Sequence, residues 1–248
     1  MQIPFPNTVV ARLCLLIVLL FAVPACADEA YDKIAAGGRL YDNWWLEYNL
    51  QKPTSTHPAY PAQGKQSGAT TWRCKECHGW DYRGRDGAYR QGEHFTNIVG
   101  IQQAAGKPTT HIMATLKNRQ HQYDRVMRDY GLERLALFVS RGQVDMDAYI
   151  NTTDKAVVGD QRQGQTLYAT HCADCHGADG RRQNFGNRDK PEYMGTIARA
   201  NPWESLHKIR HGQPDAYFMG EAMPHMLGTI TLEEQIHLLS YMQTLPVE

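Results

Sequence analysis

The pattern C-x-x-C-H occurs twice in this chain, as Cys74-Lys75-Glu76-Cys77-His78 and again as Cys172-Ala173-Asp174-Cys175-His176. The first cysteines of the two copies lie 98 positions apart. In each copy, two thiols three positions apart are followed directly by an imidazole. The repeat therefore predicts two separate sites of one kind, each able to hold the same group through sulfur and nitrogen.

C-x-x-C-H is the pattern at which haem is attached covalently: the thiols add to the two vinyl groups, and the histidine reaches the iron. A thioredoxin-like redox pair would need a βαβ pattern around it, which the sequence lacks. A shared zinc site would have to span the 94 residues between the two pairs, and it would leave the histidines unexplained. We therefore expect two covalently attached haem c groups. They would be held by Cys74, Cys77, Cys172 and Cys175, with His78 and His176 as iron ligands.

The N-terminus is typical of a secretory signal peptide. Arg12 precedes an apolar run of eleven residues, 13–23, and Ala25-Cys26-Ala27 fits a cleavage site. We expect residues 1–27 to be removed on export to the periplasm. In the alternative, Cys26 becomes a lipidated N-terminus, but Pro24 fits that pattern poorly. No later segment is long and apolar enough to predict a transmembrane helix.

Cysteine use and charge limit the other functions. Of six cysteines, Cys14 and Cys26 lie in the signal peptide and the other four belong to the two motifs, so none is left for a disulfide or a nucleophile. Acidic and basic residues number 26 each, and loss of residues 1–27 leaves a net charge of about −1. This balance argues against nucleic acid as a partner.

Residues 159–248 resemble a class I cytochrome c domain. Gly164-Gln165-Thr166-Leu167-Tyr168, four residues before Cys172, suits a first helix that ends at the haem attachment site. Asn201 and Pro202 are suited to begin a second helix. Thr231 and Glu234 form a capping box for a closing helix, whose apolar residues recur at helical spacing. The resemblance implies a fold in which the first and last helices cross.

Residues 28–158 repeat this plan with an insertion. Gly37-Gly38-Arg39-Leu40-Tyr41 matches Gly164–Tyr168, but 29 additional residues separate Tyr41 from its motif. The insertion, about residues 46–73, is rich in proline and glycine, which predicts a loop. Leu132–Val139 is the expected closing helix, with Leu132, Leu135 and Phe138 buried. The predicted fold class is all-α, with two cytochrome c-like helical haem domains, of which the first carries this loop.

The second haem has a preferred sixth ligand. Met223 precedes the closing helix, and Met223-Pro224 resembles the Met-Pro pair that supplies this ligand in class I cytochromes c. The alternatives for this position are Met219, His225 and Met226.

The sixth ligand of the first haem follows from an alignment. Leu135 and Phe138 align with Ile236 and Leu239 at an offset of 101, which maps Met223 onto position 122, beside His121. We therefore expect His121 to bind the first iron. Met127 and then His57 are alternatives, with His94 and His111 ranked lower. His207, His211 and His237 fall on predicted helices and are not expected to be ligands.

The resemblance implies a carrier of single electrons between periplasmic redox proteins, one a donor and one an acceptor. The alternative is a haem enzyme or the cytochrome subunit of a periplasmic oxidoreductase, similar to sulfur-compound dehydrogenases or to peroxidases. Two-haem thiosulfate dehydrogenases use a cysteine ligand at the catalytic haem, and no unassigned cysteine remains here outside the signal peptide. A catalytic role is therefore the less favoured interpretation.

Overall fold

The computed structural model of the chain describes residues 23–214 and 223–248, with side chains from residue 28 onward. The predicted signal peptide and Cys26 therefore lie outside the described side chains, as does Met219. The described residues form helices, turns and two isolated bridges, without a β-strand. The prediction of an all-α fold is confirmed. No helix in these two ranges is long and apolar enough to cross a bilayer.

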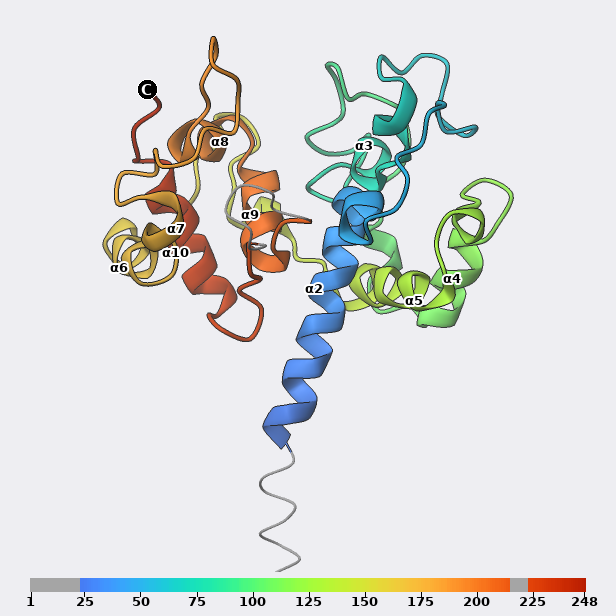
Figure 1. Cartoon of the computed structure of the whole chain (residues 1–248), viewed down its shortest axis with the longest axis horizontal. Helices are drawn as coiled ribbons and strands as arrows, with labels where there is room; N and C mark the ends of the chain where they lie inside the picture. The colour runs from blue at the N-terminus through green and yellow to red at the C-terminus, as the bar shows by residue number, and fades with distance from the viewer. Residues whose placement is uncertain (1–22, 215–222) are drawn as a thin grey trace, which may run out of the picture.

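The helices gather in two lobes, one on each side of the upper part of α2 (Figure 1). The N-terminal lobe contains the α-helices α2 (Val23–Glu47), α3 (Cys74–His78), α4 (Thr109–Leu116) and α5 (Asp129–Leu137). It also has 3₁₀ turns η1 (Gly68–Trp72), η2 (Gln102–Ala104), η3 (Tyr123–Arg125) and η5 (Met146–Ala148), and a π turn, η4 (Phe138–Gly142). The C-terminal lobe (residues 159–248) contains α6 (Gln161–His171), α7 (Ala173–His176), α8 (Met194–Ala200), α9 (Pro202–His211) and α10 (Leu232–Met242).

In the C-terminal lobe, the crossing of α6 and α10 is the most extensive helix contact. It is close because Gly164 has no side chain: a Cβ there would lie 2.0 Å from the carbonyl oxygen of His237. The helix starts are those that the sequence predicts. Asn201 accepts a bond from the Glu204 amide ahead of Pro202, and Thr231 and Glu234 form the capping box of α10.

The N-terminal lobe repeats this crossing with α2 and α5. A Cβ on Gly37 would lie 2.1 Å from the carbonyl oxygen of Arg134 on α5. Leu132, Leu135 and Phe138 are buried, as their spacing predicts. The α2 helix is interrupted at Asn43, where the backbone is extended (φ −157°, ψ 88°). Beyond this kink the helix continues to Glu47, where the chain enters the loop that precedes η1 and α3.

That loop, residues 48–67, has no regular helix until η1. It is nevertheless anchored to the lobe. The indole of Trp72 donates to the carbonyl of Ser55 (2.8 Å), and the side-chain amide of Gln63 donates to the carbonyl of Thr96 (3.5 Å). His57 is buried. The insertion therefore packs as a part of the N-terminal lobe.

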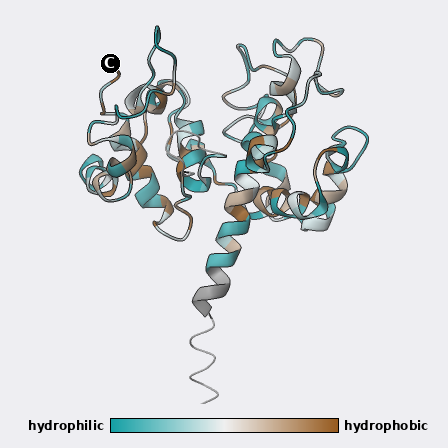
Figure 2. Cartoon of the chain, viewed as in Figure 1, coloured by the Kyte–Doolittle hydropathy of each residue, from teal (hydrophilic) through white to brown (hydrophobic). Residues whose placement is uncertain are grey.

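The two lobes meet where α2 contacts α9. A Cβ on Gly38 would lie 2.3 Å from the ring of His211, so the helices approach closely. Apolar residues concentrate on the inner faces of both lobes and near this contact, whereas the part of α2 after residue 27 that extends away from them is mainly polar (Figure 2). The contact joins elements that are about 170 residues apart in the sequence.

Candidate haem sites

The two C-x-x-C-H motifs have the same local geometry. Each forms a short helix, α3 or α7, that ends at a glycine with positive φ, +79° at Gly79 and +83° at Gly177. A side chain would be strained at this φ, which explains glycine directly after both histidines. A buried tyrosine donates to the carbonyl of each glycine: Tyr41 to Gly79 (2.6 Å) and Tyr168 to Gly177 (2.9 Å). The G-x-x-L-Y repeat thus places two equivalent tyrosines behind two equivalent motifs.

The four motif cysteines are free thiols. Burial raises the pKa of Cys74, Cys77 and Cys172 to about 12, so these three groups carry their protons at neutral pH. The sulfur of Cys74 lies 4.0 Å from the hydroxyl of Tyr123. Both pairs are therefore available for covalent attachment rather than engaged in a disulfide.

His78 and His121 face each other in the N-terminal lobe. Their ring centres are 6.3 Å apart and their planes differ by 17°. Nδ1 of His78 is 2.7 Å from the carbonyl of Val99, and Nδ1 of His121 is 3.2 Å from the side-chain oxygen of Asn118. Within the described residues, Nε2 of each ring has no hydrogen bond. Burial lowers the pKa of His78, and it lowers that of His121 to about 4 with a contribution from His78, so both rings are neutral.

The other residues considered as sixth ligands of the first iron have different surroundings in the structure. Met127 is buried beside Gly131 and the ring of Tyr48. His94 bonds to the carboxylate of Glu76 (2.9 Å) and stacks on Tyr89. Two further histidines complete the set: His111 is exposed on α4, and both ring nitrogens of His57 are hydrogen-bonded.

In the C-terminal lobe, His176 is buried and its Nδ1 atom has no hydrogen-bond partner in the described part of the chain. Burial lowers its pKa, so the ring is neutral. Met223 is half-buried, and its carbonyl accepts from the Gln213 amide (3.3 Å). His225 bonds instead to Asp32 of α2 (2.9 Å), and Met226 is buried in the core. Met219 lies outside the described residues.

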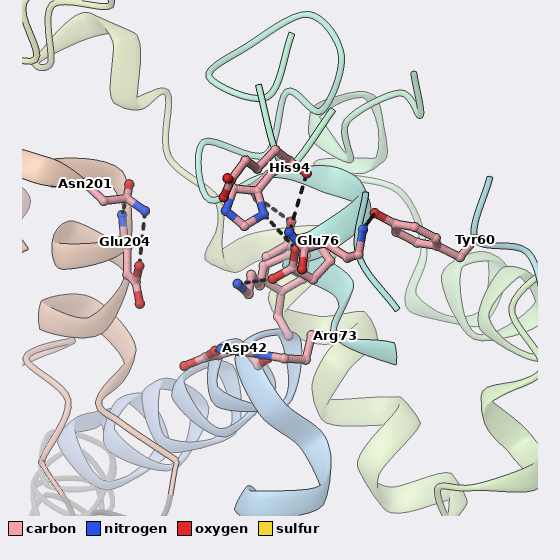
Figure 3. Close-up of polar contacts among 12 residues, drawn as sticks. Asp42, Tyr60, Arg73, Glu76, His94, Asn201 and Glu204 are labelled. Carbon is pink, nitrogen blue, oxygen red and sulfur yellow. Dashed lines mark hydrogen bonds and ion pairs between the residues drawn. The ribbon is translucent and has the colours of Figure 1, made fainter. Parts of the chain in front are cut away.

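Buried charges surround the first motif (Figure 3). Glu76, inside the motif, is paired with Lys75 and with His94. Burial alone would raise the pKa of Glu76, but these two partners hold it below its ordinary value. Beside this cluster, the guanidinium of Arg73 pairs with the buried carboxylate of Asp42. Each carboxylate is thus compensated, as a buried charge requires.

The contact between the lobes includes histidines for which the sequence predicted no role in binding iron. His207 is fully buried; its Nδ1 is 2.7 Å from the hydroxyl of Tyr82, and its Nε2 is 2.9 Å from the carbonyl of Gly38. Trp80, two residues after His78, lies 5.0 Å from the same ring. Their positions at i and i+4 on α9 place His207 and His211 on one face of that helix, but nothing in the sequence says what covers that face.

Residues 161–246 match the family model described as Cytochrome c. A search of curated proteins found no match, and a search of solved structures found none either. The matched segment coincides with the C-terminal lobe, so this part of the chain is similar to a c-type cytochrome with covalently bound haem c. The match supports a role as a haem electron carrier that works with redox protein partners.

The side chains fit this cofactor. The rings of His78 and His121 are nearly parallel, with their centres 6.3 Å apart, so the two imidazoles are close enough to be ligands of one iron. In the N-terminal lobe, the neutral rings of His78 and His121 have hydrogen-bonded Nδ1 atoms, which is the form that ligates through Nε2. Free thiols sit beside both histidines.

Proposed function

We propose that the protein is an exported two-haem c-type cytochrome that carries single electrons between a donor and an acceptor protein in the periplasm. The family match covers only residues 161–246, so the second haem rests on the repeated geometry. The observation that carries the proposal is the pair of equivalent motifs, each backed by a buried tyrosine bonded to the glycine after the histidine.

Each residue of the two motifs would have a specific role in holding haem. Cys74 and Cys77 would attach the first haem and Cys172 and Cys175 the second, while His78 and His176 would bind the irons. When bound, haem supplies a one-electron iron couple. The protein's part is to fix two ligands per iron, exclude water from the rings and hold the ligand imidazoles neutral. The carbonyl of Val99 orients the ring of His78 by accepting from its Nδ1.

We assign His121 and Met223 as the sixth ligands. For His121 the support is the parallel arrangement with His78 and the free Nε2 atoms. For Met223 it is the Met-Pro sequence and a partly buried position ahead of α10. Imidazole stabilises ferric iron more than a thioether does, so the first haem would have the lower potential.

The number of haems can be tested by mass. Protein produced in an oxidising compartment with haem-ligation machinery should have the mass of the chain from Asp28 plus two haems, which resist acid-acetone extraction. The double variant C74A/C77A should keep one haem, and so should C172A/C175A. A single haem in the wild type would overturn the assignment.

The spectrum of the oxidised protein tests whether it is an electron carrier or a haem enzyme. A carrier should contain only six-coordinate low-spin haem, with a weak far-red sulfur-to-iron band that M223A abolishes. A high-spin fraction that binds cyanide at once would favour a haem enzyme.

A further inference from the structure

The insertion of the N-terminal lobe contributes one buried histidine, His57. Only 7 % of its surface is exposed. Its ring lies edge-on to Trp72, with 4.4 Å between ring centres, and 5.9 Å from the ring of Tyr123. A polar ring at this depth must satisfy both of its nitrogens, so its partners define its role.

Those partners fix the tautomer. The amide of Ala59 donates to Nδ1 of His57 (3.1 Å). Nδ1 is therefore an acceptor, and the hydrogen resides on Nε2. Nε2 is 3.1 Å from the backbone carbonyl of His121 and donates to it. The backbone of His57 is also fixed, because its amide donates to the hydroxyl of Thr71 (2.8 Å).

Apart from Tyr123, whose hydroxyl donates to the carbonyl of Trp72 (2.7 Å), the segment around His121 is held mainly by hydrogen bonds within its own turn. Asn118 accepts from the amides of Gln120 and His121, each at 2.9 Å. Gln122 follows in the left-handed region (φ +55°), and its amide returns to the Asn118 carbonyl. Bonds of this local kind shape the turn but do not fix it relative to His78. Links to elements outside the turn come from Tyr123 and from His57, and the bond from His57 ends on His121 itself.

We propose that His57 is a positioning residue for the first iron: it holds the backbone of His121 so that the imidazole stays opposite His78. The inference rests on the proposed function, because it assumes that His121 is the ligand. The proposal also assigns a function to the insertion, which is to supply this hydrogen-bond donor. The loop 48–67 and η1 bring a donor to the ligand turn from 64 residues away in the sequence.

Two variants of His57 separate the hydrogen bond from the ring. H57Q removes the ring but can still present an amide N–H near the position of Nε2. H57N also removes the ring, and its amide is too short to reach His121. The control is H111N, which changes an exposed histidine of the same lobe. The measurement is the rate at which cyanide displaces the sixth ligand of the oxidised first haem, followed by the EPR signal of the bis-imidazole iron.

We expect H57N to exchange faster than wild type by up to about tenfold, the factor that corresponds to one lost hydrogen bond. H57Q and H111N should exchange at nearly the wild-type rate. The far-red band of the second haem should be unchanged in all three, which shows that the C-terminal lobe is intact.

Equal rates in H57N and H57Q would overturn the proposal, whether both match wild type or both are raised. High-spin first haem in both variants before cyanide is added would also overturn it, because His57 would then be the ligand. A different variant tests whether His121 is the ligand at all. If H121A kept the wild-type EPR signal and potential, the assignment of His121 would be wrong, whatever the result for His57.

Discussion

Tyr41 and Tyr168 illustrate how single residues build the two sites. Each hydroxyl donates to the carbonyl of the glycine that ends the motif helix, and that carbonyl also accepts from the backbone amide three residues later. Because burial raises the pKa of both phenols, each remains a donor at any physiological pH. The same residue type therefore anchors the backbone directly after the histidine in both lobes.

The first prediction concerns His121. H121M should raise the potential of the lower-potential haem, because a thioether favours ferrous iron more than imidazole does. The potential of the other haem should change little, since Met223 lies in the other lobe. A redox titration with spectra of each haem measures both. If both potentials stay in place, another residue holds the first iron.

The second prediction concerns the buried pair of Asp42 and Arg73. Burial alone would raise the pKa of Asp42, but Arg73, with Lys208, holds it below its ordinary value. The pKa of Asp42 is thus lower in the folded chain than in the unfolded chain. The ion pair therefore stabilises the fold fully at a pH above the unfolded-state pKa, and this stabilisation is lost as the pH falls through the folded-state pKa. D42N should therefore lower the free energy of unfolding at pH 7 by about 3–5 kcal/mol.

Denaturant unfolding at pH 7 and at pH 3 measures this effect, and the deficit of D42N should shrink at the lower pH. The control is E29Q, which removes an exposed pair with Lys33 and should leave stability unchanged. An equal deficit at both pH values would mean that Asp42 acts through packing rather than charge.

At the scale of helices, much was predictable from the sequence because caps and spacing are local. Asn201-Pro202, Thr231 and Glu234 act as predicted.

The alignment of the two closing helices, by contrast, was predicted with an offset of 101, which is wrong by two residues. The glycine contacts place Arg134 opposite His237, an offset of 103, and Leu135 then matches Leu238, both fully buried. Ile236, Leu238 and Leu239 are all buried on α10, so either offset matches Leu135 to a buried apolar residue, and the apolar pattern alone could not distinguish them. With the new offset, Met223 maps to position 120, still beside His121.

The third prediction concerns the two helix crossings. An alanine inside a helix is normally more favourable than glycine. At Gly37 and Gly164, however, the new Cβ would lie about 2 Å from a carbonyl oxygen of the opposing helix. G37A and G164A should therefore each destabilise the protein by about 1–3 kcal/mol. Thermal unfolding measures this. Q165A, on the exposed face of α6, is the control and should change stability little. Stabilisation by either glycine variant would contradict the close crossing.

At the scale of the molecule, the sequence predicted two helical units but not how they meet. Their contact depends on surfaces far apart in the chain, and no local pattern reports it. The structure joins the lobes through buried polar groups: His207 is bonded to Tyr82 and to Gly38, and Arg39 donates to the carbonyl of His211 (3.0 Å). Directional bonds of this kind, with both partners buried, favour one relative orientation of the lobes.

The last prediction tests this docking. Y82F would leave Nδ1 of His207 buried without a donor, which costs about 1–3 kcal/mol. Burial lowers the pKa of His207 from 6.5 to about 4. The unfolded chain therefore binds more protons between these values, and the docked state should lose stability as the pH falls from about 6.5 toward 4.

Denaturant unfolding, followed by the signals of the two haems, measures this effect. In the wild type at pH 7, the far-red band of the second haem and the EPR signal of the first should disappear together in denaturant. In Y82F, or near pH 5, the two transitions should separate. Coincident transitions in Y82F, with wild-type stability, would mean that the lobes are held by other contacts.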